Sequence, residues 1–333
     1  MILITGCNGL VGQAVARLLL TQNHAIRAIK RPGSDLRLLR DIEDQIEWIE
    51  GDVLDVLVLE KALLGVEYVV HAAALVSFAP KQRAEMYQVN VEGTANVVNA
   101  CLRAGVKKMA FISSIAALGR PVPTGNSTAA VSINEDQKWE ESPLNSHYAK
   151  SKYLAELEVW RGVAEGLSVV VVNPSVILGE GDWKRSSTQL FKYVYDQKQF
   201  YTEGFINYVD IQDVARAVVV LLLSDIKNER FILNAGHTPY QELFAKMAAA
   251  FGKKAPHWRV SPNLIPLIWR IEALRSWLTG KAPLITRETA KTARSRVVFD
   301  ASKIKKELHF EFNSLDKTVT RVCEYLVQNQ PLD

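Results

Sequence analysis

The sequence has few cysteines, little clustered charge and no long apolar run, and each shortage excludes a class of protein. Its three cysteines, Cys7, Cys101 and Cys323, lie far apart and form no C-x-x-C or Cys/His cluster. This indicates reduced thiols in a cytoplasmic protein and predicts no metal site. The net charge of +4 over 333 residues is spread along the chain, so nucleic acid is not an expected partner.

No apolar run reaches the ~18–20 residues that a membrane-spanning helix needs. The nearest candidate, NLIPLIWRIEALRSWL at 263–278, carries three charged residues. We expect it to form an amphipathic helix on its own protein, so membrane contact is not predicted. The chain begins directly with the strand-like MILITG, so a signal peptide is not expected either.

Short apolar runs alternate with helical periodicity over the first half of the chain. The runs are Ile2–Thr5, Ala25–Ile29, Ile46–Ile49, Tyr68–Ala72, Met109–Ser113 and Ser168–Val172. Strands and helices that alternate at ~20–40 residue spacing are typical of parallel βαβ units. Continuous apolar strands indicate a sheet covered on both faces. The sequence therefore predicts a Rossmann-type α/β fold with a doubly wound parallel sheet.

The pattern changes after about residue 174, where a polar loop leads into a helical segment rich in aromatic residues. We predict a dinucleotide-binding domain of residues 1–173 plus about 204–235. A smaller, mainly helical substrate lobe would comprise about 174–203 plus 236–333.

The stretch TGCNGLVGQAV joins the first strand to the first helix and contains Gly6, Gly9 and Gly12. Gly6 allows a tight turn, Gly9 lets backbone N–H groups approach a pyrophosphate, and Gly12 lets the helix pack closely on the sheet. This predicts a dinucleotide site at the junction. Its residues would be Thr5, Gly6, Asn8, Gly9, Leu10, Val11 and Gly12.

The end of the second strand bears on the choice of dinucleotide. NAD binders usually place Asp or Glu there for the ribose 2′-hydroxyl, whereas this strand ends in Lys30 and Arg31. Arg31, with Ser34 beside it, suits a 2′-phosphate. NADP(H) is therefore favoured, and Asp35, a few residues later, keeps NAD(H) open.

Further cofactor contacts are predicted where later strands end. Asp52 and Val53 would meet the adenine, and the small residues at 72–74 would let the flat cofactor lie close. The predicted set is Asp52, Val53, Ala72, Ala73, Ala74, Asn90, Asn173, Pro174 and Ser175, although a backbone brace is the expected role of Asn90.

The predicted chemistry rests on Ser114, Tyr148 and Lys152. Tyr148 and Lys152 are four residues apart and share a face if their segment is a helix. The cations of Lys152 and the nicotinamide would lower the phenol pKa of Tyr148 from its usual ~10. The phenol could then exchange a proton with a carbonyl or alcohol. Ser114 would hold the same oxygen, and neither His71 nor His147 is needed.

Together these motifs resemble the extended short-chain dehydrogenases/reductases. The matching stretches are TGCNGLVG, GDVLD, HAAA, NVEGT, the serines at 113–114, YAKSK and NPSVILG, and they cover residues 1 to about 235. The resemblance maps the family's Ser–Tyr–Lys set onto Ser114, Tyr148 and Lys152. Ser114 is preferred to Ser113 because it stands five residues before Gly119.

Within the family, IRAIKRPGS and NYVDIQDVARA most resemble the dihydroflavonol-4-reductase and 3β-hydroxysteroid dehydrogenase branch. The resemblance implies an oxidoreductase that uses NAD(P)H to reduce a ketone or aldehyde, on a bulky apolar substrate. It also implies that Arg31 reads the 2′-phosphate. A dimer through two helices is common in the family, but no residue pattern here requires one.

Two alternatives remain open. An NAD-dependent nucleotide-sugar epimerase needs the same Ser–Tyr–Lys set, although Ile206, Asn207 and Tyr208 replace the family's usual stretch there. A 4,6-dehydratase is disfavoured because Ile115 and Ala116 stand where it has an Asp–Glu pair. A non-catalytic dinucleotide-binding protein is the other alternative.

Candidates for the substrate pocket are Trp183, Phe191, Tyr208 and Trp258.

Overall fold

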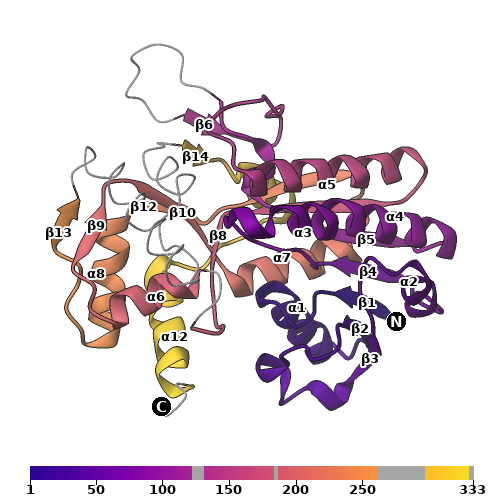
Figure 1. Ribbon diagram of the computed structural model, residues 1–333, viewed down its shortest axis with the longest axis horizontal. Coiled ribbons are helices and arrows are strands. Elements are labelled where there is room, and N and C mark those ends of the chain that lie inside the picture. The colour runs from indigo at the N-terminus through magenta and orange to yellow at the C-terminus, as the bar shows by residue number, and fades with distance from the viewer. Residues whose placement is uncertain (122–130, 184–186, 261–296, 330–333) are drawn as a thin grey trace.

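The computed structural model describes residues 1–121, 131–183, 187–260 and 297–329 (Figure 1). Its main sheet contains β1 (Ile2–Thr5), β2 (Ile26–Lys30), β3 (Ile46–Glu50), β4 (Tyr68–His71), β5 (Lys108–Ile112), β7 (Val169–Pro174) and β11 (Glu229–Leu233). The order across the sheet is β11-β7-β5-β4-β1-β2-β3, and every neighbouring pair is parallel. The predicted Rossmann-type sheet is confirmed.

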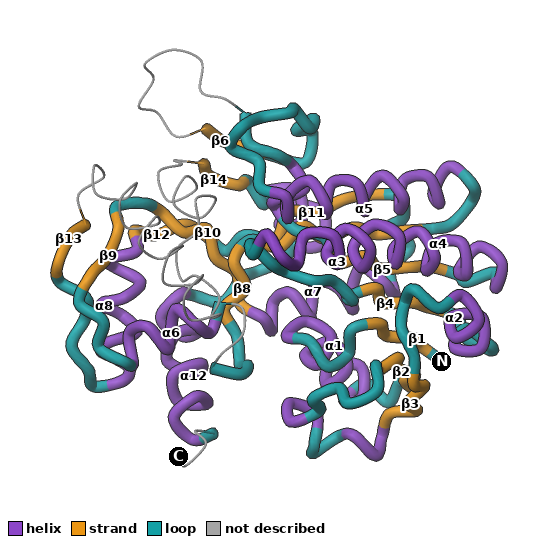
Figure 2. Tube along the Cα trace, viewed as in Figure 1, coloured by secondary structure: helices purple, strands orange, loops and turns teal. Residues whose placement is uncertain are grey.

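Helices cover both faces of this sheet. The described α-helices, on the sheet and beside it, are α1 (Leu10–Thr21), α2 (Val56–Ala62), α3 (Arg83–Tyr87), α4 (Gly93–Ala104), α5 (His147–Ala164), α6 (Thr188–Tyr195), α7 (Ile211–Leu223), α8 (Tyr240–Phe251), α11 (Ser302–Leu308) and α12 (Leu315–Gln328). One hydrophobic core joins α1, α7 and α11 to the sheet, and a second joins α2, α4 and α5 to its other face. The layers can be followed in Figure 2.

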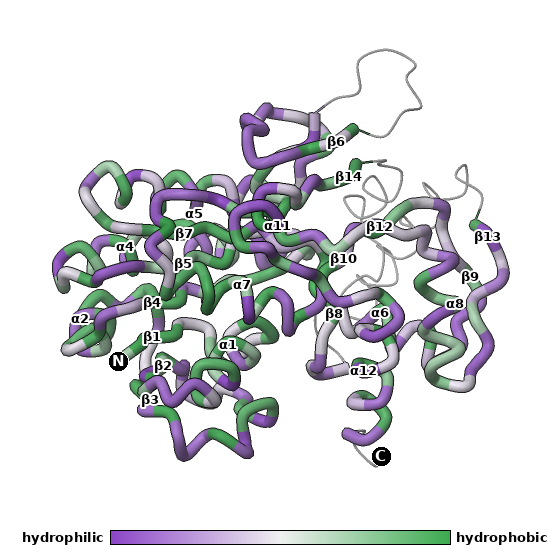
Figure 3. Tube along the Cα trace, turned by 180° about the vertical axis from the view of Figure 1, so that it is seen from behind, coloured by the Kyte–Doolittle hydropathy of each residue, from purple (hydrophilic) through white to green (hydrophobic). Residues whose placement is uncertain are grey.

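The sequence explains why the central strands and their helices form where they do. All six residues of β7, VVVVNP, are buried, and β-branched side chains suit such a strand. In Figure 3, β5 and β7 are coloured as apolar over most of their length. Helix α5 begins after Ser146, whose hydroxyl accepts the backbone N–H of Ala149, and α4 ends at Gly105 in the left-handed conformation.

A third hydrophobic core lies beside the sheet and contains side chains from α6, α8 and α12. The remaining described strands are short: β6 (Val131–Ile133), β8 (Val176–Leu178), β9 (Phe200–Thr202), β10 (Phe205–Asp210), β12 (Gly236–Pro239), β13 (Trp258–Val260) and β14 (Val297–Phe299). Side chains of β8, β9 and β10 pack in or against the third core, whereas those of β6 and β14 pack in or against the first. These short strands pair as β12-β10-β8, β13-β9 and β14-β6. The lobe expected to be mainly helical therefore also contains several short strands. The exact division into two domains stays a prediction.

Two segments predicted to be helical are the aromatic one that follows the polar loop and the amphipathic one at 263–278. The aromatic helix ends at Tyr195, and Phe200–Thr202 is a strand, so this helix is shorter than its pattern indicates. The amphipathic segment 263–278 lies outside the described residues. In the described part, none of the helices has the length and apolarity to cross a bilayer.

Candidate active site

The glycine-rich turn is packed so tightly that side chains would not fit in it. Gly6 has φ +68°, and a Cβ there would lie 2.6 Å from the backbone nitrogen of Ala73. A Cβ on Gly12 would lie 2.2 Å from the carbonyl oxygen of Gly6. The backbone of the turn, the start of α1 and the chain after β4 therefore touch directly, and only glycine permits this arrangement.

The start of α1 provides free backbone donors for an anion. Gly9 is the N-cap of α1, and no side chain caps the first turn. Uncapped N–H groups at a helix N-terminus favour a phosphate group. The residues predicted around the pyrophosphate run without interruption through this turn, from Thr5 at the end of β1 to Gly12 in α1. The donor set therefore fits a dinucleotide.

A buried hydrogen-bonded chain holds the end of β4 against the turn. Thr5 Oγ1 lies 2.6 Å from His71 Nδ1, and His71 Nε2 lies 3.0 Å from Thr94 Oγ1. Burial, followed by the nearby charge of Lys152, lowers the pKa of His71 to about 3. His71 is thus a neutral structural residue, as expected. The backbone N–H of Ala73 also donates to Thr5 Oγ1, at 3.3 Å, which places residues 72–74 beside the turn.

The end of β2 is open and basic. The Arg31 side chain is 64% exposed, and its Nε lies 4.0 Å from Asp52 Oδ2, so little restrains it. Ser34 follows in the same turn, where its N–H donates to the carbonyl of Arg31. Val53 is buried against Gly93. These positions form one surface at the edge of the sheet where a dinucleotide's adenosine would lie.

The side chains of Ser114 and Tyr148 interact at the same edge, and Ser114 Oγ also accepts the backbone N–H of Ala116 at 3.1 Å. Ser114 follows β5, and Tyr148 lies in the first turn of α5. Burial raises the pKa of Tyr148, and the bond from Ser114 opposes this rise. Lys152 does not contribute to this shift, so the structure does not show the lowering of the Tyr148 pKa that was predicted from the Lys152 charge.

Lys152 lies one turn further along α5 and is almost completely buried, with 2% exposed. Its ammonium group donates to the carbonyl oxygen of Ile112 at 2.8 Å and lies 4.6 Å from the centre of the Phe111 ring. Desolvation lowers the pKa of Lys152 to about 8, and Glu156 acts against that change. The spacing of tyrosine and lysine therefore places both on the face of α5 that meets β5.

The two adjacent serines have different partners. Ser113 Oγ donates to Glu156 Oε1 at 2.5 Å, within the protein, whereas the Ser114 side chain meets Tyr148. This difference supports Ser114 as the residue that would touch substrate. Glu156 was not predicted from the sequence, although it stands four residues after Lys152, and the same i, i+4 spacing could have revealed it.

Asn90 lies in a short π-helix, Gln88–Glu92, just before α4. Its side chain accepts the N–H of Leu75 at 2.7 Å and donates to the carbonyl of Leu75 and to Ser151 Oγ, both at 3.0 Å. The amide therefore braces the loop after β4, as the sequence suggested. Direct cofactor contact by Asn90 stays a prediction.

The end of β7 presents polar atoms that lack a partner in the described structure. Asn173 Oδ1 and Ser175 Oγ are both buried without a hydrogen bond. A buried polar atom without a partner is costly, so these two atoms are suited to receive a ligand. Together with Pro174, they lie at the end of the strand next to β5, where the nicotinamide is expected.

The predicted aromatic pocket residues are not assembled into one surface. Phe191 is fully buried in the third core, and the Trp183 ring stacks on Phe251 and meets Tyr195 at a tilt. Trp258 lies on β13 with 58% of its surface exposed. Tyr208 is partly buried, and its hydroxyl lies near Gly236. Packing therefore accounts for Trp183 and Phe191.

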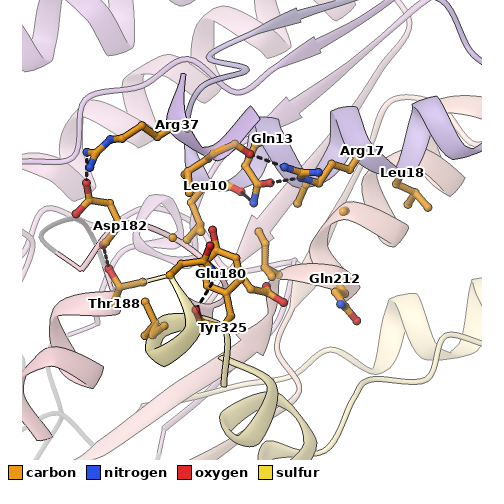
Figure 4. Close-up of a pocket in the computed structure, with 18 of the residues that line it drawn as sticks. Leu10, Gln13, Arg17, Leu18, Arg37, Glu180, Asp182, Thr188, Gln212 and Tyr325 are labelled. Carbon is orange, nitrogen blue, oxygen red and sulfur yellow. Dashed lines mark hydrogen bonds and ion pairs between the residues drawn. The ribbon is translucent and has the colours of Figure 1, made fainter. Parts of the chain in front are cut away.

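A groove of about 1330 Å³ runs along the outer side of the glycine-rich turn, between α1, α7 and α12. Figure 4 shows Arg37 reaching across its edge to Asp182, where Arg37 Nη2 lies 2.7 Å from Asp182 Oδ2. The residues that line the groove include Asn8 and Gly9 but neither Tyr148 nor Ser114. It therefore borders the pyrophosphate end of the predicted site rather than the reacting end.

No group of three or more His, Cys, Asp or Glu side chains suited to a metal ion occurs among the described residues. The three cysteines are free and buried, and burial raises the pKa of each thiol to about 12. The arrangement at the sheet edge is thus a tyrosine, a lysine and a serine beside a dinucleotide cradle.

The profile of the NAD dependent epimerase/dehydratase family matches residues 2–236. The chain belongs to this family. That span includes the glycine-rich turn, the Ser–Tyr–Lys set and every strand of the main sheet. The predicted resemblance to extended short-chain dehydrogenases/reductases is therefore confirmed, and the chain is an oxidoreductase-type enzyme of this family.

Its curated relatives include proteins named as reductases. A putative dihydroflavonol 4-reductase of Synechocystis sp. is 29% identical over 95% of this chain and 91% of its own length. A sterol demethylase protein B of Methylococcus capsulatus is 27% identical over 92% of each chain. Among solved structures, the Bordetella bronchiseptica enzyme WbmH in complex with NAD+ superposes with a TM-score of 0.76 at 20% identity, over 98% of both chains. At that identity the likeness concerns the fold alone.

Proposed function

We propose that this enzyme reduces a ketone or aldehyde with NADPH. The observation that carries the proposal is the placement of Ser114, just after β5, beside Tyr148, with Lys152 one turn further along α5 and bonded to the end of β5. These three side chains lie where β5 ends, the edge at which doubly wound sheets bind their ligands.

The proposed mechanism gives each side chain one task. The chemistry supplied by bound NADPH is hydride transfer from nicotinamide C4 to the carbonyl carbon. Tyr148 donates its phenolic proton to the carbonyl oxygen, which becomes the hydroxyl of the product. Ser114 donates a hydrogen bond to the same oxygen and holds it beside Tyr148. Lys152, as a cation, stabilises the tyrosinate that remains.

The preference for NADPH rests on Arg31. Its guanidinium is exposed, and its nearest described carboxylate, that of Asp52, is 4.0 Å away. It is therefore free to turn toward a 2′-phosphate, which it can bind through two parallel N–H groups. NAD(H) is the alternative cofactor, since Asp35 lies nearby, although Asp35 already accepts hydrogen bonds from Arg37.

We propose a bulky, apolar carbonyl compound as the substrate. The names of the two curated relatives, a dihydroflavonol reductase and a sterol demethylase protein, both refer to polycyclic compounds.

The test is NADPH consumption, followed by absorbance with a panel of aldehydes, ketones, flavanonols and ketosteroids. We expect substrate-dependent loss of NADPH, and we expect Tyr148→Phe to abolish it while cofactor affinity stays within a few-fold. Full activity of Tyr148→Phe would refute its role as the acid. If purified enzyme holds NAD tightly and consumes no NADPH with any carbonyl, nucleotide-sugar epimerisation replaces reduction as the proposal.

A further inference from the structure

A buried carboxylate lies directly behind the Ser–Tyr–Lys set. Glu156 is on α5, four residues after Lys152 and eight after Tyr148, so all three share one face of the helix. It is 1% exposed. Its Oε1 accepts hydrogen bonds from Ser113 Oγ at 2.5 Å and from Asn173 Nδ2 at 2.6 Å. Glu156 thus ties α5 to the ends of β5 and β7.

Its second oxygen contacts the edge strand of the sheet. Glu156 Oε2 lies 3.1 Å from Arg230 Nη2 on β11, and the Arg230 guanidinium stacks over Trp160 with 5.5 Å between centres. All three partners of Glu156 present N–H or O–H groups to it: the Ser113 hydroxyl, the Asn173 amide and the Arg230 guanidinium. A carboxyl group surrounded only by donors is satisfied when it is ionised. The interior behind the site therefore contains a carboxylate paired with the Arg230 guanidinium.

The charge of this carboxylate matters for Lys152, whose burial disfavours its ammonium form. The groups that face Lys152 are Tyr148 and Glu156 on its own helix, His71 on β4, and the carbonyl of Ile112 on β5. His71 is neutral at ordinary pH. Among the charged groups described here, Glu156 is therefore the one that favours the ammonium form, and Arg230 lies on the far side of Glu156.

The same carboxylate also acts on Ser114 through the backbone. Asn173 Nδ2, which donates to Glu156, lies 3.0 Å from the carbonyl oxygen of Ser114. The neighbouring residue, Ser113, donates to Glu156 directly. Both contacts restrict the chain where it leaves β5, so the position of Ser114 depends on Glu156.

We propose that Glu156 is a positioning residue that keeps Lys152 protonated and fixes Ser114 for proton transfer by Tyr148. The inference rests on the proposed reductase function for its consequence in turnover, but the charge on Lys152 can be measured without any substrate. A purely structural Glu156 would tie the strands together and leave the titration of Lys152 unchanged.

The test compares three variants: Glu156→Gln, Arg230→Gln and the double variant E156Q/R230Q. The protein is labelled with ¹³C-lysine, the Lys152 signal is assigned by its loss in Lys152→Met, and its titration is followed by NMR. We expect Glu156→Gln to lower the midpoint by roughly 1 pH unit, the size typical for loss of a nearby opposite charge. Arg230→Gln should leave it unchanged or raise it, because Glu156 then acts on Lys152 without a competing cation.

The double variant protects the test against a variant that fails to fold, since it removes both members of the Glu156–Arg230 ion pair and leaves neither of them unpaired. It too should lower the Lys152 midpoint relative to wild type. The proposal is overturned if a folded variant without Glu156 titrates as wild type does, or if Arg230→Gln lowers the midpoint as much as Glu156→Gln.

Kinetics separate this inference from the proposed function. Reduction needs charged Lys152, so kcat/KM should fall as pH rises through its pKa. In the pH profile of kcat/KM, the midpoint of this alkaline decrease should move to lower pH in Glu156→Gln, by the same amount as the Lys152 midpoint measured by NMR. If wild type reduces no carbonyl while the NMR shift is present, the reductase proposal fails and the electrostatic role of Glu156 stands. If turnover is present and the alkaline decrease does not move, the role of Glu156 fails alone.

Discussion

Replacement of Gly12 by alanine tests the glycine-rich turn as the cofactor cradle. The added Cβ would lie 2.2 Å from the carbonyl oxygen of Gly6, where ordinary contact begins at 3.4 Å. The obstacle is backbone, so α1 and the turn must move apart by more than 1 Å. Overpacking of this kind costs about 1–3 kcal/mol. If that cost falls on the cofactor-bound state, the dissociation constant for NADPH rises about 5- to 150-fold.

The assay is NADPH titration by fluorescence, with unfolding measured on the same samples. Gly9→Ala should weaken binding less, because its Cβ would lie 3.2 Å from the Gly6 carbonyl oxygen. Gly65→Ala is the matched control. Gly65 has φ +72°, and a Cβ added there would have nothing within 4 Å. This variant should therefore be less stable than wild type but bind NADPH with unchanged affinity. A folded Gly12→Ala protein that binds NADPH within twofold of wild type would refute the cradle.

Three further predictions follow from the site. Arg31→Ala should weaken the binding of NADPH far more than the binding of NADH. Equal losses of affinity in titrations with the two cofactors would show that Arg31 does not contact the 2′-phosphate. Ser114→Ala should lower kcat without a loss of stability. Ser113→Ala removes a hydrogen-bond donor from Glu156, so it should lower the free energy of unfolding by about 1–3 kcal/mol. If Ser113→Ala lowers kcat and Ser114→Ala lowers stability instead, the two serines have the opposite roles. Because the pKa of His71 is about 3 when folded and ordinarily 6.5, its contribution to stability is complete above pH 6.5. It is lost on acidification toward pH 3 at about 1.4 kcal/mol per pH unit, and urea unfolding of His71→Gln should show a shallower acid loss.

The sequence predicts the parts of this protein that depend on local pattern. The strand runs match the main sheet to within one or two residues because buried parallel strands are continuous apolar stretches. The glycine turn and the Tyr148–Lys152 spacing are equally local, and the structure places both at one sheet edge. The spacing to Gly119 favours Ser114 over Ser113 in the sequence, and the structure adds that the Ser113 hydroxyl turns inward to Glu156.

Features made by distant segments escape such reasoning. The pairing of β6 with β14 joins residues 131–133 to 297–299, and no periodicity indicates which partner a three-residue strand will find. The i, i+4 spacing of Glu156 from Lys152 indicates a shared helix face, but not which side chains Glu156 contacts. Its role depends on Asn173 and Arg230, which come from two other strands.

The third core also has a consequence for the order in which the protein folds during synthesis. The main sheet is complete once β11, ending at Leu233, has left the ribosome. The third core combines Leu178 and Phe191 with Val322 and Leu326 of α12. Leu178 and Phe191 are therefore synthesised early but stay exposed beside the completed sheet until nearly the whole chain has been made. A chain that stops before α12 would leave these side chains uncovered, so premature termination should yield a protein that chaperones recognise although its main sheet is already formed.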